Sequence, residues 1–251
     1  MNDILTSLTL RAERNLNSLR ANSYPGRGLI IGPDDTGNYL EEIYWMSGRS
    51  EESRNRIFCA DGERGHLFTA PADLKKMAGK DTTNIIYSAM RDDGVNFVVS
   101  NGHQTDAVMN GINCENPLSK ILRNWQYEAD PPNDTPRITG VCSLKMNPRF
   151  ELSILRKSIA DSSCERFFFE YDNIPDGFGY CITTYAGDGN PLPAFEGEPI
   201  LMSLSGNQGT ILDRFWGALN EDNRVAIAVK QIEIATGKAR FHIRNKYPKL
   251  G

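Results

Sequence analysis

The stretch YPGRGLIIGPDDTGNYLEEIYWMSG, residues 24–48, decides the fold of this chain. Proline and glycine within residues 25–28 end any preceding helix, and the apolar run at 29–31 is typical of a buried strand. Residues 33–38 are rich in Pro, Asp, Gly and Asn, which favour a turn. The stretch therefore predicts a β-hairpin over residues 28–48.

Outward from this hairpin, the chain consists mainly of short apolar runs separated by turns. Apolar residues at helical spacing predict an amphipathic helix over residues 1–21, and similar spacing recurs at 118–127 and 208–219. Strand-like runs lie at residues 66–69, 84–90, 96–100, 138–144, 166–171, 180–185 and 224–234. Because the strands come in adjacent groups rather than in βαβ alternation, we expect an α+β fold with antiparallel sheet, as one domain over residues 1–251.

Composition narrows the class of protein. The 251 residues carry 28 Lys and Arg against 32 Asp and Glu, a net charge of −4, whereas a nucleic-acid surface is usually basic. No apolar run approaches the ~18 residues of a membrane span, and the N-terminus has no signal-peptide core. The five cysteines are scattered and form no C-x-x-C pair. We therefore expect a cytoplasmic protein with free thiols and no nucleic-acid or membrane partner.

Common cofactor and metal motifs are missing from the sequence. There is no G-x-x-x-x-G-K-[ST] loop, no third glycine of a dinucleotide loop after Gly28, and no G-x-S-x-G elbow. The three histidines, His66, His103 and His242, are far apart and lack H-E-x-x-H spacing. We therefore expect neither a metal site nor a cofactor.

Two segments contain arginines in settings that suit an anion. Arg27 lies in a glycine-flanked turn at the start of a strand, and residues 46–56 contain three arginines and three serines. Guanidinium groups bind phosphate bidentately, and hydroxyl groups can complete the cradle. The alternative for residues 46–56 is a solvated charged turn balanced by Glu51 and Glu52.

Two further polar segments follow apolar ones. Residues 100–106 form a polar turn directly after a predicted strand, where a site often opens. Residues 127–138 run from Tyr-Glu-Ala-Asp through clustered prolines to Thr-Pro-Arg-Ile. Its alternative is a proline-rich surface loop.

Taken together and in this order, these segments resemble the stand-alone IMP cyclohydrolase family. The Y-x-G-R start at 24–27, the arginine- and serine-rich turn, the N-G-x-x-T-D turn at 101–106 and the Y-E…T-P-R-I stretch all match. The segment YAGDGNPLPAFEGE at 185–198 is similar to the bacterial branch. The resemblance covers residues 24 to about 200, and the joint order of the motifs is its specific part.

The resemblance implies a four-layer αββα sandwich like that of N-terminal nucleophile hydrolases, without their self-processing. It implies a cyclohydrolase run in the ring-closing direction, which converts 5-formamidoimidazole-4-carboxamide ribonucleotide to inosine monophosphate in purine biosynthesis. The implied partner is a purine nucleotide, no cofactor is needed, and a homo-oligomer is compatible with the family.

By residue-for-residue match, Tyr87 and Glu128 take the family's catalytic positions, Glu128 as proton shuttle and Tyr87 as donor to the formyl oxygen. The family expects an uncharged residue at Asp134, whose carboxylate would repel the substrate phosphate if it pointed inward. The resemblance assigns phosphate and ribose to Arg27, Arg49, Ser50, Asn55 and Arg56, and the base pocket or its surroundings to Asn101, Thr105, Asp106 and Arg137.

Two other functions remain open from the sequence. A true N-terminal nucleophile amidohydrolase would need cleavage that exposes Ser23, whereas we expect an intact N-terminus because residues 5–19 read as a docked helix. A non-catalytic nucleotide-binding protein would be favoured by loss of Tyr87 or Glu128, and both residues are present.

Overall fold

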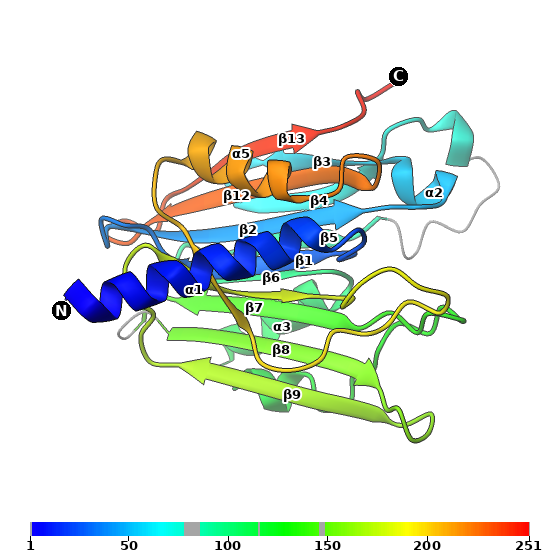
Figure 1. Cartoon of the computed structure of the whole chain (residues 1–251), viewed down its shortest axis with the longest axis horizontal. Coiled ribbons are helices and arrows are strands. Elements are labelled where there is room, and N and C mark those ends of the chain that lie inside the picture. Colours follow the sequence, from blue (N-terminus) through cyan, green and yellow to red (C-terminus); the bar gives the residue numbers. More distant parts are fainter. Residues whose placement is uncertain (1, 78–85, 115, 146–148, 251) are drawn as a thin grey trace.

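The computed structural model of the protein describes residues 2–77, 86–114, 116–145 and 149–250, which form two antiparallel sheets packed face to face (Figure 1). The first sheet has the order β11-β10-β1-β2-β12-β13 and the second has the order β3-β4-β5-β6-β7-β8-β9. The strands of the first sheet are β1 Gly28–Pro33, β2 Tyr39–Ser47, β10 Phe178–Thr183, β11 Ile200–Ser203, β12 Arg224–Glu233 and β13 Ala239–Asn245. Those of the second are β3 Arg56–Asp61, β4 His66–Pro71, β5 Ser88–Asp92, β6 Asn96–Ser100, β7 Arg137–Ser143, β8 Arg149–Lys157 and β9 Cys164–Tyr171.

The predicted hairpin is confirmed and lies at the centre of the first sheet. β1 and β2 pair antiparallel, with Gly28 opposite Trp45. A side chain at Gly28 would collide with the Trp45 ring, so the pairing needs glycine there. The Asp34 carboxylate closes the turn by accepting hydrogen bonds from the backbone N–H of Asn38 and of Tyr39, both at 3.1 Å.

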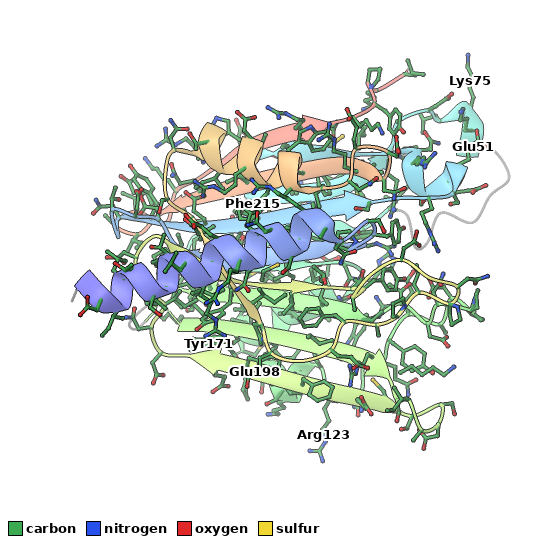
Figure 2. The ribbon with its side chains drawn as sticks, in the orientation of Figure 1. Glu51, Lys75, Arg123, Tyr171, Glu198 and Phe215 are labelled. Atoms are coloured by element: carbon green, nitrogen blue, oxygen red, sulfur yellow. The ribbon has the colours of Figure 1, made fainter. Side chains whose placement is uncertain are left out.

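Alternation along these strands builds the layers of the fold. On β1 and β2, Leu29 and Tyr44 face the core shared with the second sheet, whereas Ile30 and Trp45 face the helices. Phe215 of α5 lies over this outer face and stacks on Trp45, with the ring centroids 6.5 Å apart (Figure 2).

Helices cover the outer face of each sheet. α1 Asn2–Ala21 and α5 Gln208–Ala218 pack on the first sheet, and α3 Gln104–Asn113 with α4 Leu118–Ile121 packs on the second. The predicted α+β sandwich is therefore confirmed, with its layers in the order helix, sheet, sheet, helix. The finer likeness to N-terminal nucleophile hydrolases stays a prediction. The remaining short helices are α2 Glu51–Arg54, η1 Gly62–Arg64 and η2 Lys75–Met77.

Several elements differ from the sequence prediction. The helix expected over 118–127 ends at Ile121, and the strand expected over 84–90 begins at Ser88, with residues 84–85 outside the described residues. The sequence predicts a polar turn over residues 100–106, but α3 begins at Gln104 within that segment. Gln104 and Thr105 lie on the buried face of the helix, and these polar residues obscure its apolar period. The unpredicted strands β3, β8, β11 and β13 are short or mix charged with apolar residues.

Within the described ranges, no helix has both the length and the apolar character to cross a membrane.

A group of charged residues is buried at the end of the sandwich where β5 finishes. The Lys230 Nζ lies 2.5 Å from Asp92 Oδ2 and 3.6 Å from Glu42 Oε2, and both Lys230 and Glu42 have no exposed surface. On the helix-facing side, the Glu41 carboxylate accepts a 2.8 Å hydrogen bond from Gln231 Nε2. Burial raises the pKa of Glu41 to about 8, against the Gln231 hydrogen bond, and raises that of Glu42 to about 7, against the Lys230 charge.

These raised pKa values predict a loss of stability as the pH rises. The unfolded chain releases the Glu41 and Glu42 protons near pH 4.5, whereas the folded chain keeps them until about pH 7 to 8. The free energy of unfolding should therefore fall between about pH 4.5 and pH 8, because the unfolded state binds fewer protons there. Glu41→Gln should reduce that fall, by about 1.4 kcal/mol for each pKa unit that is removed.

Urea unfolding at pH 5 and pH 8 measures this difference. Glu63→Gln is the matched control, because Glu63 is exposed on a turn. A Glu41→Gln protein that loses as much stability between the two pH values as the unmutated protein would contradict the prediction.

Candidate functional site

Most of the predicted site residues are brought to one end of the sandwich by the strand topology. Neighbouring strands are antiparallel, so β1, β3, β5 and β7 begin at the end where β2 and β10 finish, beside α2 in Figure 1. Arg56 and Arg137 are the first residues of β3 and β7, and Arg27 and Tyr87 directly precede β1 and β5. Four residues from distant parts of the sequence thus meet at the same end of both sheets.

Three arginines and one buried glutamate set the charge of this end. Burial opposes the charge of Arg27, but the Glu128 carboxylate and nearby phenol oxygens outweigh it and raise the pKa of Arg27. Burial and the charge of Arg27 lower the pKa of Arg56, and burial lowers that of Arg137 against the attraction of Glu128. Glu128 is 5 % exposed and interacts with both Arg27 and Arg137. Since three arginines gather at this end and two of them share one carboxylate, the site favours an anionic ligand.

Arg27 has an unused hydrogen-bond donor at the centre of the site. Its Nε is buried and has no hydrogen-bond partner in the structure. A buried donor without a partner costs free energy. A ligand acceptor would remove that cost.

A pair of hydrogen-bonded tyrosines lies beside the arginines. The hydroxyl groups of Tyr44 and Tyr87 are 2.7 Å apart, and both side chains are buried. The backbone of Tyr87 is fixed by Thr69, which donates from its N–H to the Tyr87 carbonyl and accepts from the Tyr87 N–H, each at 3.0 Å. Burial and the neighbouring Tyr87 raise the pKa of Tyr44 well above its usual range.

The loop that carries Glu128 is joined to a third tyrosine. The Glu128 N–H donates to the Thr135 carbonyl at 2.9 Å, and the Thr135 hydroxyl lies 2.6 Å from both Asp130 Oδ2 and the Tyr185 hydroxyl. An ionised carboxylate only accepts, so Thr135 donates to Asp130 and Tyr185 donates to Thr135. A lone pair of the Tyr185 oxygen is left to accept from another donor.

Arg49 lies at the rim and already has an anionic partner. Its guanidinium forms an ion pair with the Asp188 carboxylate, donates to the Gly189 carbonyl at 3.1 Å, and sits 4.8 Å from the centre of the Tyr24 ring. Tyr24 in turn stacks on Tyr185 at 6.0 Å. A phosphate at Arg49 would therefore have to compete with Asp188.

Two other predicted ligands in this segment have partners within the protein. Ser50 caps α2 by accepting a 3.1 Å hydrogen bond from the Ser53 N–H. The Asn55 side chain donates to the Asp73 carbonyl at 2.9 Å and accepts from the Asp73 N–H at 2.7 Å. These contacts give both side chains a structural role at the edge of the site.

The N-G-x-x-T-D turn is also held by internal hydrogen bonds. Asn101 donates to the Pro136 carbonyl at 2.9 Å and accepts from the Ile138 N–H at 2.8 Å. The Thr105 hydroxyl donates a 2.5 Å hydrogen bond to the Ser88 carbonyl, and the Asp106 carboxylate forms a 2.9 Å ion pair with Arg91. The Arg137 guanidinium donates to Gln104 Oε1 at 3.0 Å and so joins this turn to the arginine group. Asn101 and Thr105 thus support the site from behind, and the Asp106 carboxylate is held by Arg91 instead of by the three arginines.

The carboxylate of Asp134 is engaged by a cation. It forms a 2.6 Å ion pair with Lys157 Nζ. This ion pair neutralises the charge of Asp134, at a position where the family resemblance predicts an uncharged residue.

Three residues of the site were missing from the sequence-based set, namely Tyr24, Tyr44 and Tyr185. Tyr24 and Tyr185 lie inside the motifs that carried the resemblance, so the motifs themselves were the signal. Tyr44 lies in a predicted strand, and alternation places it on the same face as Met46. Nothing in the sequence indicates that this face meets Tyr87.

A second hollow lies at the opposite end of the sheets. This cleft of about 700 Å³ is lined by the turns at 62–65, 92–94 and 236–240. Its charged side chains have both signs, and most of them are exposed, as for Arg64 at 82 %. It therefore offers less selectivity for an anion than the arginine site. Among the described residues, no three His, Cys, Asp or Glu side chains gather closely enough to hold a metal ion.

The α+β sandwich with arginines, tyrosines and Glu128 at one end defines a protein with a pre-formed site suited to a small anionic molecule. Residues 24–237 match the family model described as IMP cyclohydrolase-like protein, and the chain belongs to this family. The match extends past the predicted limit near residue 200 and includes α5 and β12. A comparison with curated proteins finds no match.

The contacts of Asn101 predict that this residue matters for stability. Asn101→Ala should lower the free energy of unfolding by about 2–3 kcal/mol, because buried hydrogen-bonding groups at Pro136 and Ile138 lose their partner. Urea denaturation measures the loss. Asn110→Ala is the matched control, since Asn110 is exposed on α3 and should change stability little. An equal effect of the two substitutions would contradict the role given to Asn101.

Proposed function

We propose that the protein is an IMP cyclohydrolase, which closes 5-formamidoimidazole-4-carboxamide ribonucleotide to inosine monophosphate in purine biosynthesis, acting as a single cytoplasmic domain. Membership of the family supports this proposal. The observation that carries it is the grouping of Tyr87 and Glu128 around Arg27 and Arg137. The reaction needs a proton acceptor, which the Glu128 carboxylate supplies, and a proton donor, which the Tyr87 phenol supplies. The arginines supply the anchor for the phosphate.

The reaction needs one group to take a proton and one to give a proton. The carboxamide nitrogen attacks the formyl carbon, an N–C bond forms, and the nitrogen loses a proton to Glu128. The former formyl oxygen takes one proton from Tyr87 and becomes a hydroxyl group. It takes a second proton, from the protonated Glu128, when its C–O bond breaks and water leaves. The C=N bond forms as the formamide nitrogen loses its hydrogen to the Tyr87 oxygen, which returns both residues to their starting states. Because both reacting groups sit on one ring, holding the formamide in the reactive rotamer supplies much of the catalysis.

The arginines would anchor the 5′-phosphate. Arg27 and Arg56 lie beside the Tyr87 hydroxyl, and Arg27 has a free donor at Nε. Arg49 would also bind the phosphate once the phosphate has replaced the Asp188 carboxylate as its ion-pair partner. In this proposal Arg137, with the Asn101 and Thr105 turn behind it, borders the base.

Incubation of the purified protein with the formamido ribonucleotide, followed by chromatography for inosine monophosphate, tests the proposal. Formation of inosine monophosphate at a rate proportional to protein concentration is the expected result. Tight nucleotide binding without conversion would instead identify a non-catalytic binding protein.

An amidohydrolase activated by cleavage before Ser23 is the second candidate. The contacts of this region favour an uncleaved chain in our proposal, because α1 packs on β11 and the Ser23 carbonyl accepts a 2.9 Å hydrogen bond from Asn223. Intact-mass measurement of active protein should show no species that begins at Ser23. Finding such a species would replace the cyclohydrolase by the amidohydrolase.

Phosphate anchoring predicts a specific effect of Arg56→Ala. Hydrogen bonds to charged groups contribute about 1.5–3 kcal/mol, so substrate affinity should fall roughly ten- to hundredfold. Titration calorimetry with inosine monophosphate measures the change. Arg123→Ala is the control, because Arg123 points into solvent away from the site (Figure 2). If inosine binds the unmutated protein as tightly as its monophosphate, the anchoring role is wrong.

Proton transfer predicts that Glu128 and Tyr87 act together. Glu128→Gln keeps the shape but removes the base, and should lower turnover by about 10²–10⁴-fold. Tyr87→Phe should also act mainly on turnover. In the double variant, turnover should fall by less than the product of the two single-variant factors, because the two groups serve one transition state. Near-normal turnover of Glu128→Gln would leave Glu128 as only a counter-ion of Arg27 and Arg137.

A further inference from the structure

Tyr44 is a buried polar residue to which the proposed chemistry gives no role. It lies on β2 with no exposed surface, and its ring rests against Phe58 with the centroids 5.5 Å apart. Its hydroxyl lies 2.7 Å from that of Tyr87. A buried hydroxyl is costly unless it has a partner, and here the partner is Tyr87.

The direction of this hydrogen bond decides what Tyr87 can do. A phenol donates one hydrogen, so Tyr87 has none for a ligand if it donates to Tyr44. The other neighbour of the Tyr87 hydroxyl is Met46 Sδ at 3.8 Å, a weak acceptor. If Tyr44 donates instead, the Tyr87 hydrogen is free to turn toward the site.

Two arginines lie close to this pair of phenols. Arg27 and Arg56 both interact with the oxygens of Tyr44 and Tyr87. Their positive charge stabilises negative charge on the oxygen that loses a proton. Tyr87 directly precedes β5 at this end of the sheets and also interacts with Arg137, whereas Tyr44 lies within β2, so Tyr87 is the phenol that faces the substrate in this proposal.

We propose that Tyr44 is a positioning residue, which donates its hydrogen to the Tyr87 oxygen and so directs the Tyr87 hydrogen at the former formyl oxygen of the substrate. When the Tyr87 O–H bond breaks and the new O–H bond forms on the substrate, the charge left on the Tyr87 oxygen is held by the Tyr44 hydroxyl and the two arginines. Tyr44 keeps its own proton throughout. This inference rests on the proposed function.

Tyr44→Phe tests the inference, because it keeps the ring against Phe58 and removes only the hydroxyl. Turnover should fall roughly ten- to hundredfold, as for loss of a hydrogen bond to a charged group, with KM within about twofold. The affinity for inosine monophosphate should also stay within about twofold, because the Tyr44 side chain has no exposed surface and does not contact the ligand in this proposal. A purely structural defect of the site would weaken nucleotide binding together with turnover.

Tyr171→Phe is the matched control. Tyr171 stacks on Tyr180 at 4.2 Å and lies toward the other end of the molecule from Glu51 of α2 (Figure 2). Removal of its hydroxyl in Tyr171→Phe should leave turnover and nucleotide affinity unchanged. Thermal melting of both variants checks that each is folded.

A second measurement does not depend on activity. Neutron diffraction of the deuterium-exchanged protein locates the hydrogen between the two phenol oxygens, and it should be bonded to the Tyr44 oxygen. A hydrogen bonded to the Tyr87 oxygen and directed at Tyr44 would overturn the role of Tyr44 whatever the substrate is. Failure of the unmutated protein to close the ring, with the hydrogen on Tyr44, would overturn the proposed reaction instead. Normal turnover of Tyr44→Phe would overturn the inference alone.

Discussion

The two-residue alternation of side chains along the central hairpin is the constraint on which the rest of the structure depends. β1 and β2 must bury both faces, so Leu29 and Tyr44 enter the core between the sheets while Ile30 and Trp45 require a cover of helices. The second sheet covers one of these faces, and the layer formed by α1 and α5 covers the other. The antiparallel order then brings alternate strand starts to one end, where the site is built.

The charged side chains at that end are buried, and their removal from water costs free energy. Burial and the charge of Arg27 lower the pKa of Arg56, whereas Glu128 and the tyrosine oxygens outweigh burial at Arg27 and raise its pKa. The remaining excess of positive charge and the unpaired Nε of Arg27 are both relieved by an anion. The site is therefore less stable when empty than a paired core would be, which favours the binding of an anion.

The motifs of this family combine residues of two kinds. Arg27, Arg56 and Tyr87 face one another at the site, whereas Asn55 and Asn101 hold neighbouring segments of backbone through paired hydrogen bonds. The second kind fixes where the first kind stands. A residue of these motifs can therefore support the site without being placed to contact a ligand.

The sequence by itself determined the elements whose signals are local. The hairpin over 28–48 follows from its turn residues, β6 from its apolar run, and α5 from its apolar period, while the ordered motifs identified the family and predicted most residues of the candidate site. Only the tertiary structure decided that Tyr44 meets Tyr87, that Arg49 pairs with Asp188 and that Tyr185 joins Thr135. Those contacts join residues 43 to 139 positions apart. Local propensity carries no information about which distant strand faces which, because that choice is made by the packing of whole sheets.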